Sequence, residues 1–177
     1  MRPVWIYALV LSTLGAGIAA TPLSARAPAR AQADLKDASG KSVGRADVRQ
    51  STDGLWVTVR ASGLTPGAHG IHVHAIGTCT APDFTSAGPH WNPDGHQHGR
   101  KNPNGAHAGD APNIVANAKG RGSLKVWLGA GLLTGGPQAL LDTDGAAVVI
   151  HADPDDEMTD PSGKSGKRIV CGVLTAR

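Results

Sequence analysis

The chain has 177 residues, enough for one domain with a sizeable core, and it combines 24 glycines and 12 prolines with few aromatic residues. Its net charge of +3 comes from the first 33 residues, which hold three arginines and no acidic residue, so the remainder is balanced. With no basic patch interleaved with aromatic residues either, we expect no nucleic-acid binding.

The first predicted element is an export leader. Arg2 supplies a short positive region, and residues 4–20 form an apolar stretch that is short for a membrane span. Ala31-Gln32-Ala33 fits the small-residue pattern cut by signal peptidases, and an earlier cut near residue 20 or an uncleaved anchor are the alternatives. We predict a periplasmic or extracellular protein without a stable membrane anchor after cleavage, divided into signal peptide and mature domain as residues 1–33 and 34–177.

After the leader, short runs of alternating apolar and polar residues lie between turn residues. Ala38-Ser39-Gly40 is a hairpin signal, and Gly70 to Ala75 alternates so that His72 and His74 lie on one face of a strand. Strands are expected at residues 34–36, 42–49, 55–60, 70–75, 123–128, 146–151 and 168–174. This rhythm predicts an all-β fold, an antiparallel Greek-key β-barrel or sandwich of about eight strands.

Two long segments interrupt the rhythm. Residues 77–113 are rich in Pro, Gly, Asn and His, and residues 152–167 are rich in acidic side chains. Long irregular loops in a compact domain are usually functional or disordered, and these two carry metal-ligand residue types. We therefore expect both to be functional loops.

The only two cysteines, Cys79 and Cys171, predict one disulfide in an exported chain, with two free thiols as the alternative. In the chain-entropy model such a bond would stabilise the fold by roughly 4–5 kcal/mol at most.

Histidines and one aspartate form an array with the spacing of a metal site. His72 and His74 offer two nitrogens from one strand, which by itself is a weak signal. A stronger one follows in the first loop, where the intervals are seven, eight and two residues: His90, His98, His107 and Asp110. Three imidazoles and a carboxylate suit tetrahedral Zn²⁺, whereas surface histidines in a polar loop are the less favoured interpretation.

Several blocks of this sequence resemble the copper-zinc superoxide dismutases, in particular the exported bacterial branch. The blocks follow in order and with matching spacing over residues 34–174: Gly70-Ile71-His72-Val73-His74, Gly88-Pro89-His90-Trp91-Asn92-Pro93, His98-Gly99, His107-Ala108-Gly109-Asp110 and Arg168-Ile169-Val170-Cys171-Gly172.

The resemblance implies one copper and one zinc per chain. Copper ligands would be His72, His74, His90 and His151, and zinc ligands would be His90, His98, His107 and Asp110. His90 would bridge the two ions, Asp155 would link a copper and a zinc histidine, and Arg168 would guide the anionic substrate. Of the other two histidines, His69 is expected to pack or hydrogen-bond, and His96 to be solvent-exposed.

The implied activity is the dismutation of superoxide to O₂ and H₂O₂ by a redox-cycling copper, an antioxidant role in the cell envelope. His90 and Arg168 would be its catalytic residues. A non-catalytic metal-buffering protein of the same fold is the main alternative. A copper-only enzyme and a structural β-sandwich are less favoured because the zinc set is complete and the histidine array needs an explanation. The resemblance is compatible with a monomer or with a homodimer.

Overall fold

The computed structural model describes residues 1, 29–136 and 138–177. These residues form ten β-strands and one short 3₁₀ helix, η1 (Thr85–Ala87). The strands are β1 (Arg30–Asp37), β2 (Ser42–Ser51), β3 (Gly54–Ala61), β4 (Gly67–His69), β5 (Ile71–His74), β6 (Ile114–Ala116), β7 (Gly122–Trp127), β8 (Ala147–His151), β9 (Arg168–Val173) and β10 (Thr175–Ala176). Within the described part of the chain, no helix has the length and apolarity to cross a membrane.

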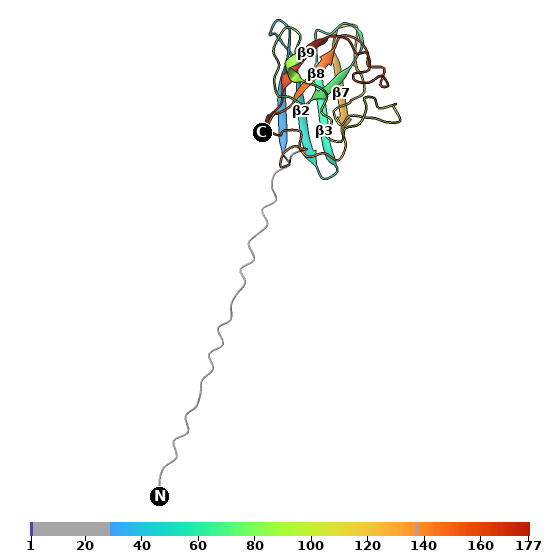
Figure 1. Cartoon of the computed structure of the whole chain (residues 1–177). Coiled ribbons are helices and arrows are strands. Elements are labelled where there is room, and N and C mark those ends of the chain that lie inside the picture. The colour runs from blue at the N-terminus through green and yellow to red at the C-terminus, as the bar shows by residue number, and fades with distance from the viewer. Residues whose placement is uncertain (2–28, 137) are drawn as a thin grey trace.

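The strands form a single antiparallel sheet that is nearly closed into a barrel (Figure 1). Their order is β4-β6-β7-β3-β2-β1-β9-β8-β5, with β10 paired to β1. The two end strands, β4 and β5, are separated only by Gly70, whose carbonyl accepts the amide N–H of His151 in β8. The predicted all-β antiparallel class is confirmed.

The strands that the sequence did not predict are all short. β4, β6 and β10 have three, three and two residues, too few for an alternating pattern to be read. They arise from pairing with neighbours, as in the register of Gly67 opposite Ala116.

The predicted leader lies mostly outside the described residues, but its last four residues form the start of β1. Ala31 and Ala33 are buried in the barrel core, and Ala31 pairs with Val48 of β2. β1 therefore begins at Arg30, four residues before the strand expected at residues 34–36, and the boundary between leader and mature domain stays a prediction.

Strands β5 and β8 are buried on both faces, which is how the barrel positions the site. Ile71 and Val73 face the barrel core, so the alternation of a strand turns His72 and His74 to the outside. The long loop covers that outer face and pairs with β5: the amide of Val73 donates to the carbonyl of Gly109, and Trp91 donates back to Val73.

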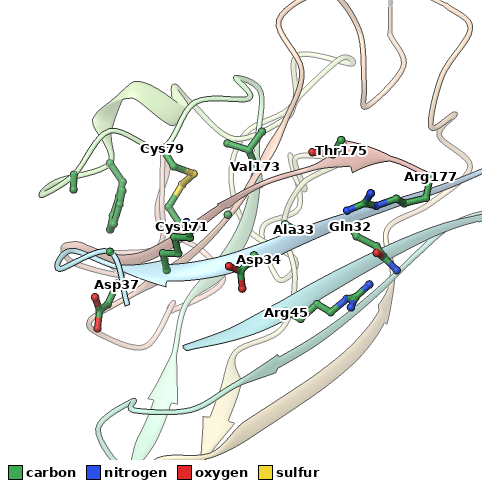
Figure 2. A pocket seen from close by; sticks show the side chains of 15 residues that line it. Gln32, Ala33, Asp34, Asp37, Arg45, Cys79, Cys171, Val173, Thr175 and Arg177 are labelled. Atoms are coloured by element: carbon green, nitrogen blue, oxygen red, sulfur yellow. A yellow bond between two sulfur atoms is a disulfide. The ribbon is translucent and has the colours of Figure 1, made fainter. Parts of the chain in front are cut away.

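The predicted disulfide is present, with Cys79 joined to Cys171 of β9. Around it a small second core covers β8 and β9, formed by Phe84, Ala87, Ala147, Val149 and Cys171. A cleft of about 620 Å³ opens beside the disulfide, with Asp34, Arg45 and Arg177 among the residues that line it (Figure 2). The first functional loop is thus attached to the barrel covalently and by packing.

Candidate metal centre

Four buried histidines converge beside β5 and the last residue of β8. Each offers a ring nitrogen, and these nitrogens lie within 4.8 Å of one another: His72, His74, His90 and His151. His72 and His74 come from β5, His151 ends β8, and His90 belongs to the covering loop. The structure therefore brings together all four side chains that the sequence analysis assigned to copper.

The nitrogens that face the centre of this group are available for coordination. His72 Nδ1, His74 Nε2 and His151 Nε2 are buried and have no hydrogen-bond partner. Leaving such atoms unsatisfied in the interior is costly, so a cluster of three indicates a site built for a cation. Three or four imidazole nitrogens are a donor set that suits copper.

Burial keeps three of these four rings neutral. It lowers the pKa of His74 to about 2, and burial together with the neighbouring His72 lowers the pKa of His151 to about 3. Burial also lowers the pKa of His90, to about 4, although the carboxylate of Asp110 works in the opposite direction. At neutral pH the lone pairs are not occupied by protons, which is the state that binds a metal.

A second cluster lies directly behind the first and is centred on Asp110. Its Oδ1 atom is 2.9 Å from His90 Nδ1, 3.0 Å from His98 Nδ1 and 3.3 Å from His107 Nδ1. In a tetrahedral zinc site with bonds of about 2.05 Å, donor atoms are separated by about 3.3 Å. The spacing of this three-nitrogen, one-oxygen set therefore fits Zn²⁺.

His72 also lies close to this second cluster, as one of four residues whose ligand atoms are within 4.8 Å: His72, His90, His98 and Asp110. Its ring stacks on His90 with centroids 3.9 Å apart. However, its Nε2 is already bonded to Asp155, whereas His107 Nδ1 is only 3.3 Å from His90 Nδ1. His107 is therefore the better fourth member, in agreement with the sequence interpretation.

Hydrogen bonds hold Asp110 as an anion. Burial alone would raise its pKa, but hydrogen bonds from His107, His90 and His98 keep the pKa of this carboxyl well below its usual range. Its other oxygen, Oδ2, accepts the backbone N–H groups of Gly99 and His107 at 2.9 and 3.0 Å. The carboxylate is thereby fixed with one oxygen aimed at the three imidazoles.

Asp155 joins the two clusters from behind. Its Oδ2 accepts from His72 Nε2 at 2.7 Å and its Oδ1 from His98 Nε2 at 3.0 Å. Burial opposes ionisation, but the bonds from His72 and His98 hold the pKa of Asp155 below its usual value. This position is the one that the resemblance implied, and it fixes the rings of one histidine from each cluster.

The groups that hold Asp155 and the remaining rings were not predicted from the sequence. Asn113 exchanges two 2.8 Å hydrogen bonds with the backbone of Asp155. The carbonyls of Gly88 and Gly166 accept from His74 Nδ1 and His151 Nδ1 at 2.8 and 3.2 Å. Backbone carbonyls carry no sequence signal, and Asn113 resembles any other loop asparagine.

Arg168 lies at the rim of the first cluster, in a cavity of about 650 Å³ that is also lined by His90, His107 and His151. Its guanidinium donates to the carbonyls of Phe84 and Gly88, both at 2.8 Å. The guanidinium is thus held in place by the loop that the disulfide attaches, and it presents a fixed positive charge to the cavity.

The two remaining histidines lie where the sequence analysis expected. His69 is buried, with Nδ1 2.8 Å from the carbonyl of His151 and Nε2 2.9 Å from that of Thr65. His96 is exposed, and its Nδ1 donates to the carbonyl of Ala106 at 3.1 Å. Neither belongs to a cluster.

Comparison with known proteins gives a consistent result. Residues 42–174 match the family described as copper/zinc superoxide dismutase. Superoxide dismutase (Cu-Zn) 1 of Aquifex aeolicus is 41% identical over 147 residues, which cover 82% of this chain and 87% of that protein. The superoxide dismutase-like protein YojM of Bacillus subtilis is 44% identical over 145 residues, 79% of this chain and 73% of that protein.

Two solved structures are also similar to this chain. The crystal structure of a SOD-like protein from Bacillus subtilis matches with a TM-score of 0.77 and 41% identity, covering 81% of this chain and 97% of that one. Cu/Zn superoxide dismutase from Brucella abortus matches with a TM-score of 0.64 and 29% identity, covering 82% and 99%.

Proposed function

Since this chain belongs to the copper/zinc superoxide dismutase family, we propose that it catalyses the conversion of two superoxide anions and two protons to O₂ and H₂O₂. The observation that carries the proposal is the pair of clusters described above, which share His90, with Arg168 in the cavity that His90 also lines. His72, His74, His90 and His151 would hold copper, and His90, His98, His107 and Asp110 would hold zinc.

Copper, when bound, supplies the one-electron redox change, and zinc supplies a fixed positive charge that does not change its redox state. His90 has Nδ1 in the Asp110 cluster, so its Nε2 is the nitrogen left for the other cluster. That atom is the one at which this residue would take up and return a proton. The Asp110 cluster keeps the ring in place while it does so.

Arg168 would bind and orient the substrate. Superoxide is a small anion, and a guanidinium held by two carbonyls offers it a charge at a fixed position next to the first cluster. Attraction of the substrate by such a field is already established for superoxide dismutases, and it raises association rates most at low ionic strength.

The test is the decay of superoxide in the presence of the purified protein, first metal-free and then loaded with zinc, with copper, and with both. We expect activity only when copper is present, and its loss after chelation. A fully loaded protein without activity would refute the proposal, as would activity that persists in the metal-free chain.

Two charge variants separate substrate attraction from metal binding. Arg168→Gln should lower kcat/KM by about tenfold or more at low ionic strength, with unchanged copper and zinc content. Arg45→Gln is the matched control, because Arg45 lines the cleft beside the disulfide rather than the metal cavity (Figure 2). Equal effects of the two substitutions would contradict a local role for Arg168.

A non-catalytic metal-binding protein is the second candidate, because one relative is named only as superoxide dismutase-like. Both donor sets and Arg168 are complete in this chain, which favours the enzyme. The loaded-protein assay separates the two: stable uptake of copper and zinc without superoxide decay would support the binding protein.

We also propose that the protein is exported. The support is the disulfide between Cys79 and Cys171, a bond that persists in oxidising compartments and is rare in the cytosol. Its role would then be to remove superoxide in the cell envelope or outside the cell.

A further inference from the structure

The outward nitrogen of nearly every non-bridging site histidine has a partner within hydrogen-bond distance. His74 and His151 use backbone carbonyls, and His72 and His98 share the carboxylate of Asp155. This arrangement matters because a ligating imidazole keeps its orientation through its second nitrogen. His107 is the remaining case.

The group that faces the outward nitrogen of His107 is the carboxylate of Asp160. His107 Nε2 lies 3.8 Å from Asp160 Oδ1. The same oxygen accepts the backbone N–H of His98 at 2.5 Å. One carboxylate oxygen thus contacts the ring of His107 and the backbone of His98, two members of the Asp110 cluster. Asp160 lies 62 residues beyond His98 in the chain.

The separation between Asp160 and His107 is that of an ion pair and is longer than a hydrogen bond, so its contribution to the stability of the site depends on charge. A cation bound at Nδ1 withdraws electrons from the ring and makes the N–H at Nε2 a stronger donor. A negative oxygen opposite Nε2 is therefore stabilising mainly when the metal is bound. The contact with the His98 backbone, by contrast, needs only an acceptor.

We propose that Asp160 is a positioning residue of the zinc site, which holds the ring of His107 and the backbone of His98 so that their Nδ1 atoms meet at Asp110. The inference rests on the proposed zinc site. Asp160 acts through these histidines and contacts no metal. It also attaches the second functional loop to the first, since Asp160 lies in the segment that follows β8.

Two substitutions separate the two contacts. Asp160→Asn keeps an oxygen for the His98 backbone N–H but removes the charge opposite His107, and Asp160→Ala removes both. Asp156→Asn is the matched control, because Asp156 belongs to the same loop but its carboxylate bonds only Met158, Thr159 and Lys164. All three variants lose one negative charge, so general electrostatic effects are equal.

The experiment measures the transfer of zinc from the copper-free, zinc-loaded protein to a chromophoric chelator. Partners of this kind usually contribute about 10–100-fold to metal affinity. We expect release to be several-fold faster for Asp160→Asn, faster again for Asp160→Ala, and unchanged for Asp156→Asn. Cobalt substituted at the zinc site should show altered visible absorption bands in the two Asp160 variants only, which a change in overall stability would not produce.

Wild-type release rates and cobalt spectra in both Asp160 variants would overturn the inference and leave the proposed dismutase activity untouched. The same would follow if all three variants accelerated release equally, because the effect would then be one of loop charge. A wild-type protein that takes up no zinc would overturn both proposals. An inactive protein with the expected order of zinc release would overturn only the proposed activity.

Discussion

Removal of the disulfide should destabilise the protein strongly and also disturb the site. Cys79 and Cys171 are separated by 92 positions. In the chain-entropy model, opening a loop of that length raises the entropy of the unfolded chain by an amount worth about 4.6 kcal/mol at 25 °C. This exceeds a quarter of the roughly 5–15 kcal/mol that usually stabilises a domain.

The effect on the site follows from the position of the loop. The carbonyl of Gly88 accepts hydrogen bonds from both His74 Nδ1 and Arg168, and Gly88 lies nine residues beyond Cys79 in the tethered segment. Without the covalent attachment, that carbonyl is held less firmly, by the small core around Phe84 and by the backbone hydrogen bonds that Ala75 and Ile76 donate to the neighbouring segment. We therefore expect kcat/KM for superoxide to fall in the metal-loaded protein and to depend less on ionic strength, since Arg168 loses its fixed position.

The assay compares guanidinium unfolding of the metal-free mature protein with that of the Cys79→Ser/Cys171→Ser variant. Reduction of the wild-type chain with dithiothreitol is the control, because it opens the same bond without changing the sequence. We expect the free energy of unfolding to fall by about 3–5 kcal/mol in both cases. A difference below about 1 kcal/mol in both would refute the reasoning.

Three further predictions follow from the site and from β1. Asp155→Asn should weaken copper and zinc binding together, by about 10–100-fold each, because one carboxylate bonds both His72 and His98. Chelator competition measures the affinity for each metal, and an effect on one metal alone would contradict the prediction. Burial opposes protonation of His98, but hydrogen bonds that its ring donates to Asp110 and Asp155 raise its pKa to about 9. The metal-free protein therefore carries a proton there at pH 7, which stabilises the fold fully below pH 6.5 and is lost as the pH rises through 9. Zinc must displace that proton, so zinc affinity should rise roughly tenfold per pH unit from 7 towards 9. Calorimetry in buffers of different ionisation enthalpy measures the number of protons released when zinc binds. Zinc binding without proton release would contradict the prediction. The mature chain should begin upstream of Arg30, since Ala31 and Ala33 are buried in β1; intact mass decides this, and a stable product beginning at Asp34 would contradict it.

The sequence by itself determined the donor types and their placement along the chain. The alternation of Ile71, His72, Val73 and His74 predicts a strand with two imidazoles on one face, and the structure has it in β5. The hairpin turn at residues 38–40 and the pairing of Cys79 with Cys171 were also predictable. These features depend on local periodicity or on there being only two cysteines. The roles assigned to the metal ligands came from resemblance to a family, and their coordination remains part of the proposal.

Tertiary structure decided how the ligand atoms meet. Asp155 lies 83 positions from His72 and Asp160 lies 62 from His98, and no local pattern sets such contacts. The carbonyls of Gly88 and Gly166, which orient His74 and His151, belong to the backbone and are the same for any residue type. The start of β1 was misplaced for a similar reason, because Ala31 and Ala33 suit a cleavage site as well as they suit a strand. Short-range patterns specify which face of an element a side chain takes, whereas the partner on that face is chosen only when distant segments pack together.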